Sequence, residues 1–537
     1  MFNFAITSLG NLFFGLSLVV FISLWFIKRE DILLQTLLLS SLGIIFYAND
    51  LITLFIGWEI MSWSSYLIIS KKASLETSQK YIIFNLGAGF ALLGAIVIIY
   101  SFVGSFLYSE IVFNEIPVSF RKPIYILLLI TIFIKSAIMP FHYWVVDTYE
   151  ESDNIFSAIL SAIISKAGIF LFITLFIKII GYKYLQTNLF DIVAWLGVIT
   201  SIVATIKAIS QDSMKRLLAY SSIAQVGYIV TVLAILNSSG LEAGLYHTII
   251  HTFVKLLLFV NIASIIYITG KTKFSELGGL LYEYPTLFIL LVIGIIGLAG
   301  MPPLAGFNSK FLIYTTLLEQ KKALLLVAVM FSSATAFLYC YKLVYGIYLG
   351  QPTHSKESYQ KLPNSYYIAQ IIGALVLIVL AIFPSLVIEE FNTILISLGF
   401  KPTDFKSLFE LNGRFASFNG GVIMSVFISI FVVILLIAYK LKNKTRKVKD
   451  RLDISYCGET PNPNINLHYG YGLGKELSRI GFIKMVLNNS TQKYWEQIKT
   501  ITQDSSLLIK QFYNMSIQNI GLIIILFFTI LLLRGVQ

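Results

Sequence analysis

The sequence predicts an all-α polytopic membrane protein, and its composition and its pattern of apolar runs lead to that fold class. The chain has 537 residues, of which 57% are hydrophobic and 13% charged, and its mean hydropathy is +0.80. A soluble globular chain carries roughly 25% charged residues. Apolar runs of about 20 residues, long enough to cross a bilayer, recur almost without pause. These features exclude an ordinary water-soluble enzyme.

The apolar runs predict about 14 membrane spans, at about 20 residues for each crossing. They lie near residues 5–27, 31–48, 50–70, 81–106, 123–141, 155–181, 188–208, 217–236, 241–269, 283–316, 322–349, 365–388, 420–440 and 519–534. The first run has neither a basic start nor a small-residue cleavage site, so we expect a retained span rather than a signal peptide. The predicted organisation is a transmembrane domain at residues 1–440, a polar segment at 441–518 and a C-terminal anchor at 519–537.

The polar segment has apolar residues at helical spacing in its second half, as in Leu477, Ile480 and Ile483. That pattern suits a helix lying along a membrane surface, and one or two ordinary helices of a cytoplasmic tail fit it equally well.

Lysine and arginine outnumber aspartate and glutamate by 40 to 28, which gives a net charge of +12. In a membrane protein this excess indicates cationic cytoplasmic loops and contacts with anionic lipid rather than with nucleic acid. The alternate loops that hold Lys71, Lys215 and Lys271 carry more cations than the other loops. We therefore assign that side to the cytoplasm and both chain ends to the opposite side.

The sequence has two cysteines, Cys340 and Cys457, which cannot form a thiolate cluster for an iron–sulfur or zinc centre. We expect no cofactor in this chain and any electron transfer in another one.

Ionisable residues inside the predicted spans are the candidate functional residues, because a charge at the middle of a membrane costs about 3 kcal/mol on insertion scales. They are Glu59, Lys135, Lys166, His247, His251, Lys255 and Lys310. The two histidines and Lys255 are spaced four residues apart, which places all three on one helix face with about 6 Å between neighbours. The spacing indicates a ladder of titratable groups.

Two of the lysines stand beside predicted helix breaks. Pro140 follows Lys135, and Pro302, Pro303 and Gly306 precede Lys310. Proline and glycine interrupt a membrane helix and free backbone groups that are tolerated only in protein-lined or hydrated surroundings.

Each candidate also has a structural explanation. Glu59 and a lysine could form an ion pair that holds helices together, and Lys166 could extend its amine to a membrane surface. The histidines could make an interhelical hydrogen bond or bind zinc, but Thr248 stands where the zinc-protease pattern has glutamate, and no third ligand is evident.

These residue types suit a proton path, because an amine near a carboxylate holds or releases its proton as the pair closes or opens. We expect Glu59 and Lys135 to be the modulating pair. Lys166 and the His247, His251, Lys255 ladder would pass the proton laterally, and Lys310 would deliver it to one side.

Six short stretches carry a family resemblance. They are Trp58-Glu59, Lys135 with Met139 to Trp144, Ser165 to Gly168, Asp212 to Ser222, the His247, His251, Lys255 ladder, and Ala299 to Lys310. In this order they resemble the antiporter-like proton-conducting membrane subunits of respiratory NADH:quinone oxidoreductase, membrane-bound energy-converting hydrogenases and multisubunit sodium/proton antiporters. The resemblance implies two inverted five-helix bundles, each with a discontinuous helix, joined by a central polar axis. It implies the same roles for Glu59, Lys135, Lys166, His251 and Lys310.

The chain departs from that pattern in two places. About two spans precede the Glu59 helix, where longer family members have about four, and residues 149–152 replace a stretch that usually contains alanine and proline. In the tail, residues 456–459 resemble the aromatic-Cys-Gly segment of hydrogenase-linked members.

The resemblance implies a proton-translocating subunit of a multisubunit redox-driven complex in a bacterial or archaeal cytoplasmic membrane, or in an organellar inner membrane. Its partners would be other membrane and peripheral subunits, and iron–sulfur, flavin or nickel–iron centres are expected only in those partners. Two alternatives stay open: a subunit of a sodium/proton antiporter without a redox partner, and a scaffold whose own path is closed. The buried lysines and histidines favour protons over sodium.

Overall fold

The structure is a computed structural model that describes residues 3–27, 31–185, 187–349, 360–403, 407–413, 416–441, 479–487 and 494–504. Residues 1–483 form one compact unit and residues 484–537 a second. Within the predicted polar segment, Gly481–Leu487 (α20) and residues 494–504 are helical. The predicted anchoring span at 519–534 and the segment around Cys457 lie outside the described residues.

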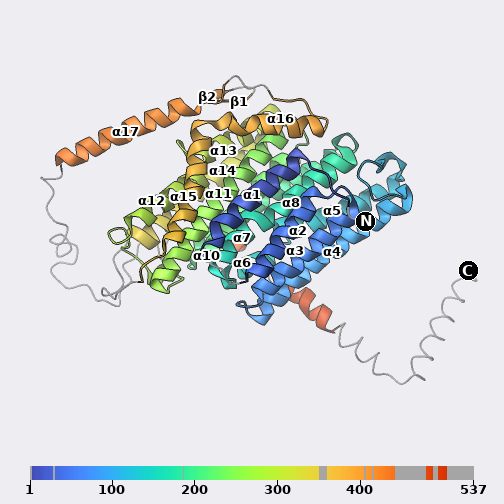
Figure 1. Ribbon diagram of the computed structural model, residues 1–537, viewed down its shortest axis with the longest axis horizontal. Helices are drawn as coiled ribbons and strands as arrows, with labels where there is room; N and C mark the ends of the chain where they lie inside the picture. Colours follow the sequence, from blue (N-terminus) through green and yellow to red (C-terminus); the bar gives the residue numbers. More distant parts are fainter. Residues whose placement is uncertain are drawn as a thin grey trace, which may run out of the picture. The chain divides into compact units, whose positions relative to one another are not determined.

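The first unit is built almost entirely of helices (Figure 1). The first half contains α1 (Ser8–Trp25), α2 (Ile32–Tyr47), α3 (Leu51–Ile69), α4 (Leu75–Val103), α5 (Val118–Ser136), α6 (Tyr143–Glu151), and then α7 (Asn154–Ile159) and α8 (Ser165–Leu171) within one span from Asn154 to Tyr184. The second half contains α9 (Thr187–Ser210), α10 (Met214–Leu233), α11 (Ser238–Thr269), α12 (Pro285–Ala299), α13 (Ala305–Glu319), α14 (Ala323–Val344), α15 (Asn364–Ile382), α16 (Ile388–Ser397) and α17 (Gly420–Leu441). Two short antiparallel strands, β1 (Glu410–Asn412) and β2 (Ser417–Asn419), pair before α17.

The prediction of an all-α polytopic membrane protein is confirmed. Ten helices of the described residues are long and apolar enough to cross a membrane. The predicted spans near 31–48, 123–141 and 283–316 are different. The first is a shorter apolar helix, and each of the other two is divided between two helices. The structure therefore supports fewer full-length spans than the predicted 14.

Local sequence explains where the helices begin and end. Asp50 and Ser213 precede α3 and α10, and their side chains accept hydrogen bonds from backbone N–H groups of the first helical turn. Gly104 and Gly270 follow α4 and α11 with φ angles of 74° and 69°, a left-handed conformation that glycine adopts without steric cost.

The two interrupted helices break where proline and glycine occur in the sequence. α5 ends at Ser136, and α6 begins only at Tyr143, with Pro140 in the interval. α12 ends at Ala299, and α13 begins at Ala305, with Pro302 and Pro303 in the interval. Lys135 thus lies one residue before the end of α5, and Lys310 lies in the second turn of α13.

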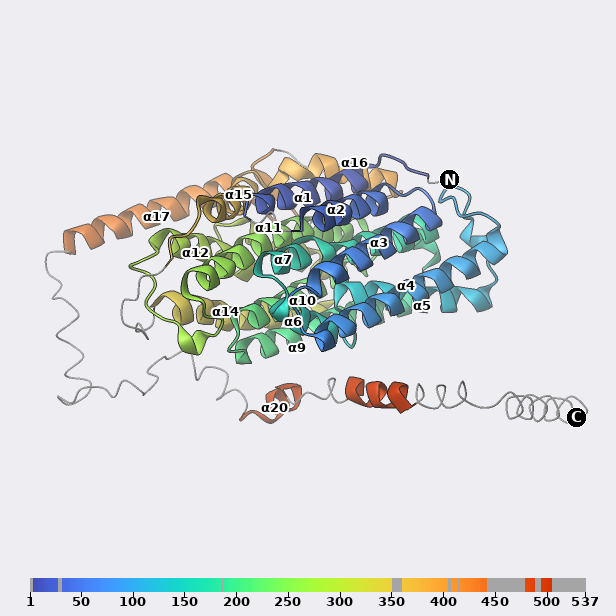
Figure 2. The ribbon, with the colours of Figure 1, turned by 60° about the horizontal axis from the view of Figure 1, so that its bottom comes forward.

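The centre of the unit is occupied by the span Asn154–Tyr184 and by α10 and α11. In each of these the most apolar stretch is 94% buried within the chain, compared with 11% for α17. α11 packs against α7, α10, α12, α13 and α15, and Figure 2 shows it running through the interior of the helix assembly. Charged side chains on these central helices therefore face protein rather than lipid.

Candidate functional site

Lys135 is held by polar and aromatic groups at the end of α5. Its amine donates to Asn85 Oδ1 of α4 at 2.9 Å and lies 5.3 Å from the centre of the Trp58 ring. Gly168 of α8 lies against the neighbouring Ser136, and an added Cβ there would come within 3.2 Å of the Ser136 backbone nitrogen. Glycine at this position lets α8 approach the fully buried lysine.

Glu59 lies on α3, half-buried, with its carboxylate against Gly89 of α4. The carboxylate hydrogen bonds with Trp63, one turn further along α3, and is near enough to Lys135 for their charges to interact. Among the described residues the two are not joined as an ion pair, since the Lys135 amine is bonded to Asn85. The structural ion pair considered from the sequence is therefore not formed in this structure.

Lys166 follows a π-helical turn at Leu160–Ile164. Such wide turns disturb the regular backbone pairing and occur frequently at functional sites. The Lys166 amine donates to the backbone carbonyl of Ser161 and to Ser165 Oγ, the latter at 3.3 Å. Because the residue is only 2% exposed, its amine does not reach a membrane surface.

His247 and His251 lie on successive turns of α11, with ring centres 6.3 Å apart and ring planes 12° from parallel. The two ring nitrogens of His247 contact Gln225 Oε1 and Ser309 Oγ, each at 3.0 Å. Within the described structure neither ring nitrogen of His251 has a hydrogen-bond partner. The charges of Lys166 and Lys255 act on the His251 ring, which places it at the meeting point of the two lysines.

A metal site is a poor description of the histidine pair. His247 uses both ring nitrogens in hydrogen bonds with α10 and α13. No group of three or more His, Cys, Asp or Glu side chains that could hold a metal occurs within the part of the chain that the structure describes.

Lys255 is linked to the surroundings of Lys166 through two serines of α10. The Lys255 amine donates to Ser221 Oγ at 2.6 Å. The next residue, Ser222, lies 2.8 Å from the hydroxyl of Ser161, whose carbonyl accepts from Lys166. The paired serines that end the stretch Asp212 to Ser222 therefore join the two lysines.

Lys310 lies just after the second helix break. Its amine donates to the carbonyl of Ala299, the last residue of α12, and to Ser333 Oγ of α14, both at 2.6 Å. The amine is 5.8 Å from the centre of the Tyr228 ring, and that ring is 6.1 Å from the His247 ring. Tyr228 thus stands between Lys310 and the histidine pair.

Sequence reasoning missed the side chains that lie between Lys135 and Lys166. Tyr81 has its ring centre 6.0 Å from the Lys135 amine, and Tyr149 of α6 is within hydrogen-bonding reach of Ser161. The two tyrosines are buried and interact with each other electrostatically. Tyrosine is common in membrane helices, so neither residue stood out from its apolar run.

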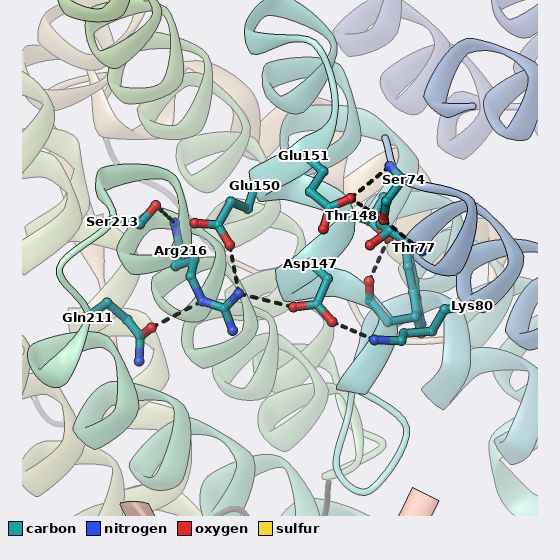
Figure 3. Close-up of polar contacts among 11 residues, drawn as sticks. Ser74, Thr77, Lys80, Asp147, Thr148, Glu150, Glu151, Gln211, Ser213 and Arg216 are labelled. Atoms are coloured by element: carbon teal, nitrogen blue, oxygen red, sulfur yellow. Dashed lines mark hydrogen bonds and ion pairs between the residues drawn. The ribbon is translucent and has the colours of Figure 1, made fainter. Parts of the chain in front are cut away.

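The acidic residues of α6 connect this short helix to both neighbouring helices (Figure 3). Asp147 pairs with Lys80 of α4 at 2.6 Å and with Arg216 of α10 at 3.0 Å. Glu150 pairs with the same guanidinium at 2.6 Å. These carboxylates lie at the end of the first interrupted helix, where they tie it to α10.

Glu151 ties α6 to α4. Its carboxylate accepts hydrogen bonds from the backbone nitrogen and the hydroxyl of Ser74, at 2.9 and 2.6 Å, just before α4 begins (Figure 3). Burial would raise the pKa of Glu151, but the hydrogen bonds from Ser74 outweigh it and lower the pKa below its ordinary value of 4.5. Residues 149–152, whose geometry the sequence left open, therefore supply a connection as well as the buried Tyr149.

The site as a whole is a series of buried ionisable groups on α5, α8, α11 and α13, separated by hydroxyls, amides and aromatic rings. Amines, imidazoles and hydroxyls can each hold a proton and pass it to a neighbour. The arrangement can therefore carry charge across the interior without exposing any member to lipid.

The family model described as NADH:quinone oxidoreductase/Mrp antiporter, TM matches residues 48–336. A chain of the membrane-bound sulfane sulfur reductase (MBS), an archaeal respiratory membrane complex, matches with a TM-score of 0.88 and 29% identity, over 98% of this chain and 89% of that one. NADH-quinone oxidoreductase subunit N of Azobacteroides pseudotrichonymphae genomovar. CFP2 is 30% identical over 57% of this chain. One Na(+)/H(+) antiporter subunit of Alkalihalophilus pseudofirmus is 28% identical over 72% of it. The matches span 65% and 52% of these two relatives.

The matched region covers more than half of the chain and contains both interrupted helices with Lys135 and Lys310. The chain belongs to the NADH:quinone oxidoreductase/Mrp antiporter transmembrane family.

Proposed function

We propose that this integral protein of the cytoplasmic membrane is the proton-translocating subunit of a multisubunit complex driven by redox chemistry in its partners. The observation that carries the proposal is the series of buried ionisable groups from Lys135 through Lys166, His251 and His247 to Lys310 on the most buried helices. Keeping so many charges inside a membrane protein for shape alone is costly. A scaffold with a closed path would gain nothing from that cost.

Glu59 and Lys135 are the proposed modulating pair. At about 4 Å and an effective dielectric constant of 20, such a pair is worth about 4 kcal/mol. Since Lys135 is bonded to Asn85 here, the structure is consistent with the open arrangement. Closing the pair would retain the proton on the amine, and opening it would release the proton toward Lys166.

The two inverted five-helix bundles are also a proposal. One set would be α2, α3, α4, the α5/α6 pair and the span Asn154–Tyr184, and the other α9, α10, α11, the α12/α13 pair and α14. In each set the fourth member is interrupted and carries a buried lysine. The same position of the break in both sets supports a repeated architecture.

The proposed partners are membrane and peripheral subunits that carry the redox chemistry. The similar chain of MBS comes from a respiratory membrane complex, and a second relative is a subunit of NADH-quinone oxidoreductase. Iron–sulfur, flavin or nickel–iron centres would reside in those partners.

A sodium/proton antiporter subunit is the second candidate, favoured by the match to the Alkalihalophilus pseudofirmus antiporter protein over 72% of the chain. Sodium prefers oxygen ligands, whereas the central groups here are amines and imidazoles. Purifying the intact complex and identifying its co-purifying chains and cofactors separates the two candidates, because only a redox-driven complex brings electron-transfer centres.

The experiment that tests the proposal uses this purified complex in proteoliposomes, with the electron donor that its cofactors indicate. Lys135→Ala and Lys310→Ala should each remove the proton transport contributed by this protein while the complex still assembles. Lys183→Ala, outside the buried series, is the control and should leave transport unchanged. Undiminished transport in both buried-lysine variants would refute the proposed function.

A further inference from the structure

Glu242 is a buried carboxylate that lies outside the lysine and histidine series. It is in the second turn of α11, five residues before His247, and its residue surface is only 5% exposed. Sequence reasoning passed over it because it lies close to the start of an apolar run, where a charge is normally solvated.

The surroundings of Glu242 contain a hydroxyl and a second carboxylate but no neutralising cation. Thr403, in the segment after α16, is within hydrogen-bonding reach of the Glu242 carboxylate, and Glu319 at the end of α13 is near enough for the two charges to interact. Among the described residues, no Lys, Arg or His side chain forms an ion pair with it. Burying a carboxylate without a cation is costly, so its retention at this position calls for a function.

A column of buried polar groups runs from Glu242 toward the histidine pair. Tyr246 is one turn further along the same face of α11, and its hydroxyl lies 3.4 Å from Asn308 Nδ2 of α13. The next residue, Ser309, contacts His247 Nδ1 at 3.0 Å. All four residues after Glu242 in this column are buried.

The other end of the column reaches a polar surface. Thr403 and Glu319 are both half-buried, and Glu319 has exposed residues on either side of it in the sequence. This surface lies at the end of α10 and α11 opposite to the one where Ser213 pairs with Lys273. The opposite end carries Lys215 and the other loop cations that mark the cytoplasmic side, so Glu242 is on the non-cytoplasmic side.

We propose that Glu242 is the terminal proton-transfer residue of the axis, exchanging protons between His247 and the aqueous phase on the non-cytoplasmic side. This inference rests on the proposed function. A proton leaving the His247 ring passes along Ser309, Asn308 and Tyr246, with water bridging the intervals that side chains do not close. It protonates the Glu242 carboxylate and is then released past Thr403, so that only N–H and O–H bonds form and break.

The test is turnover-driven proton transport by the intact complex in proteoliposomes, with Glu242→Gln as the principal variant. Glutamine has nearly the same shape and can bond to Thr403, but it carries no exchangeable acidic proton. We expect transport to fall to the level of Lys310→Ala while assembly and uncoupled electron transfer stay at the wild-type level. Glu242→Asp, which retains the carboxyl group, should recover most of the transport, and the half-buried neighbour variant Glu319→Gln should transport normally.

Tyr246→Phe removes one hydroxyl from the column and keeps the ring, so it tests the route even if Glu242→Gln fails to assemble. It should slow transport several-fold in an assembled complex, and wild-type transport in this variant would overturn the route. Wild-type transport in Glu242→Gln together with loss of transport in Lys310→Ala would overturn the role of Glu242 and leave the proposed function intact. Wild-type transport in Lys135→Ala and Lys310→Ala would instead overturn the proposed function.

Discussion

At the scale of single residues, the buried charges are each held by short polar contacts from a different helix. Lys135 uses an amide of α4, Lys255 a hydroxyl of α10 and Lys310 a hydroxyl of α14. A hydroxyl or amide neighbour satisfies an amine without fixing its charge, whereas a permanent ion pair would. This choice of neutral partners keeps the lysines able to change protonation state.

Gln225→Leu tests this reasoning at His247. The variant removes the acceptor for His247 Nε2, and a buried polar group left without its partner costs about 1–3 kcal/mol. We expect proton transport per assembled complex to fall several-fold. Gln370→Leu is the matched control, because Gln370 is equally buried and bonds to Asn261 and Ser264, away from the axis. Comparable destabilisation with normal transport is expected there, and equal transport by both variants would contradict the role of Gln225.

At the scale of helices, the two breaks depend on close backbone contact. An added Cβ on Gly306 would lie 2.7 Å from the carbonyl carbon of Gly297, so the start of α13 can only touch α12 through glycine. Gly306→Ala should destabilise the complex by about 1–3 kcal/mol, the usual cost of overpacking, and lower its thermal unfolding temperature. Gly87→Ala on α4 has open space around it and should be neutral or slightly stabilising, since alanine favours helix. An unchanged unfolding temperature in Gly306→Ala would show that the contact is not required.

The α6 carboxylates are the second helix-scale feature. Glu150→Gln weakens one of two links from α6 to Arg216 and leaves Asp147 in place. Partly exposed ion pairs are worth roughly 0–1 kcal/mol and are screened by salt. We expect a small loss of thermal stability at low ionic strength that disappears at high ionic strength. Glu390→Gln, at an exposed position of α16, should show no such dependence, and a salt-independent loss in Glu150→Gln would argue against an electrostatic link.

At the scale of the whole molecule, sequence alone predicted the membrane fold and the positions of the helix breaks, because charge and proline are conspicuous in apolar runs. It could not predict the pairing of Glu150 with Arg216, since the two are 66 residues apart and each looks like an ordinary loop charge. Nor could it identify Tyr149, which is unremarkable in sequence and matters only because α6 brings it beside Ser161. The number of spans was overestimated because hydrophobicity does not distinguish a full crossing from two half-helices.

The central claim is that the buried groups from Lys135 to Lys310 form one connected, hydrated path. A high-resolution cryo-electron microscopy map of the intact complex tests it most directly. We predict ordered water density within hydrogen-bonding distance of Lys166, His251 and Lys310, bridging each to its neighbour in the series. Tightly packed hydrocarbon side chains between these groups, with no intervening water density, would contradict it.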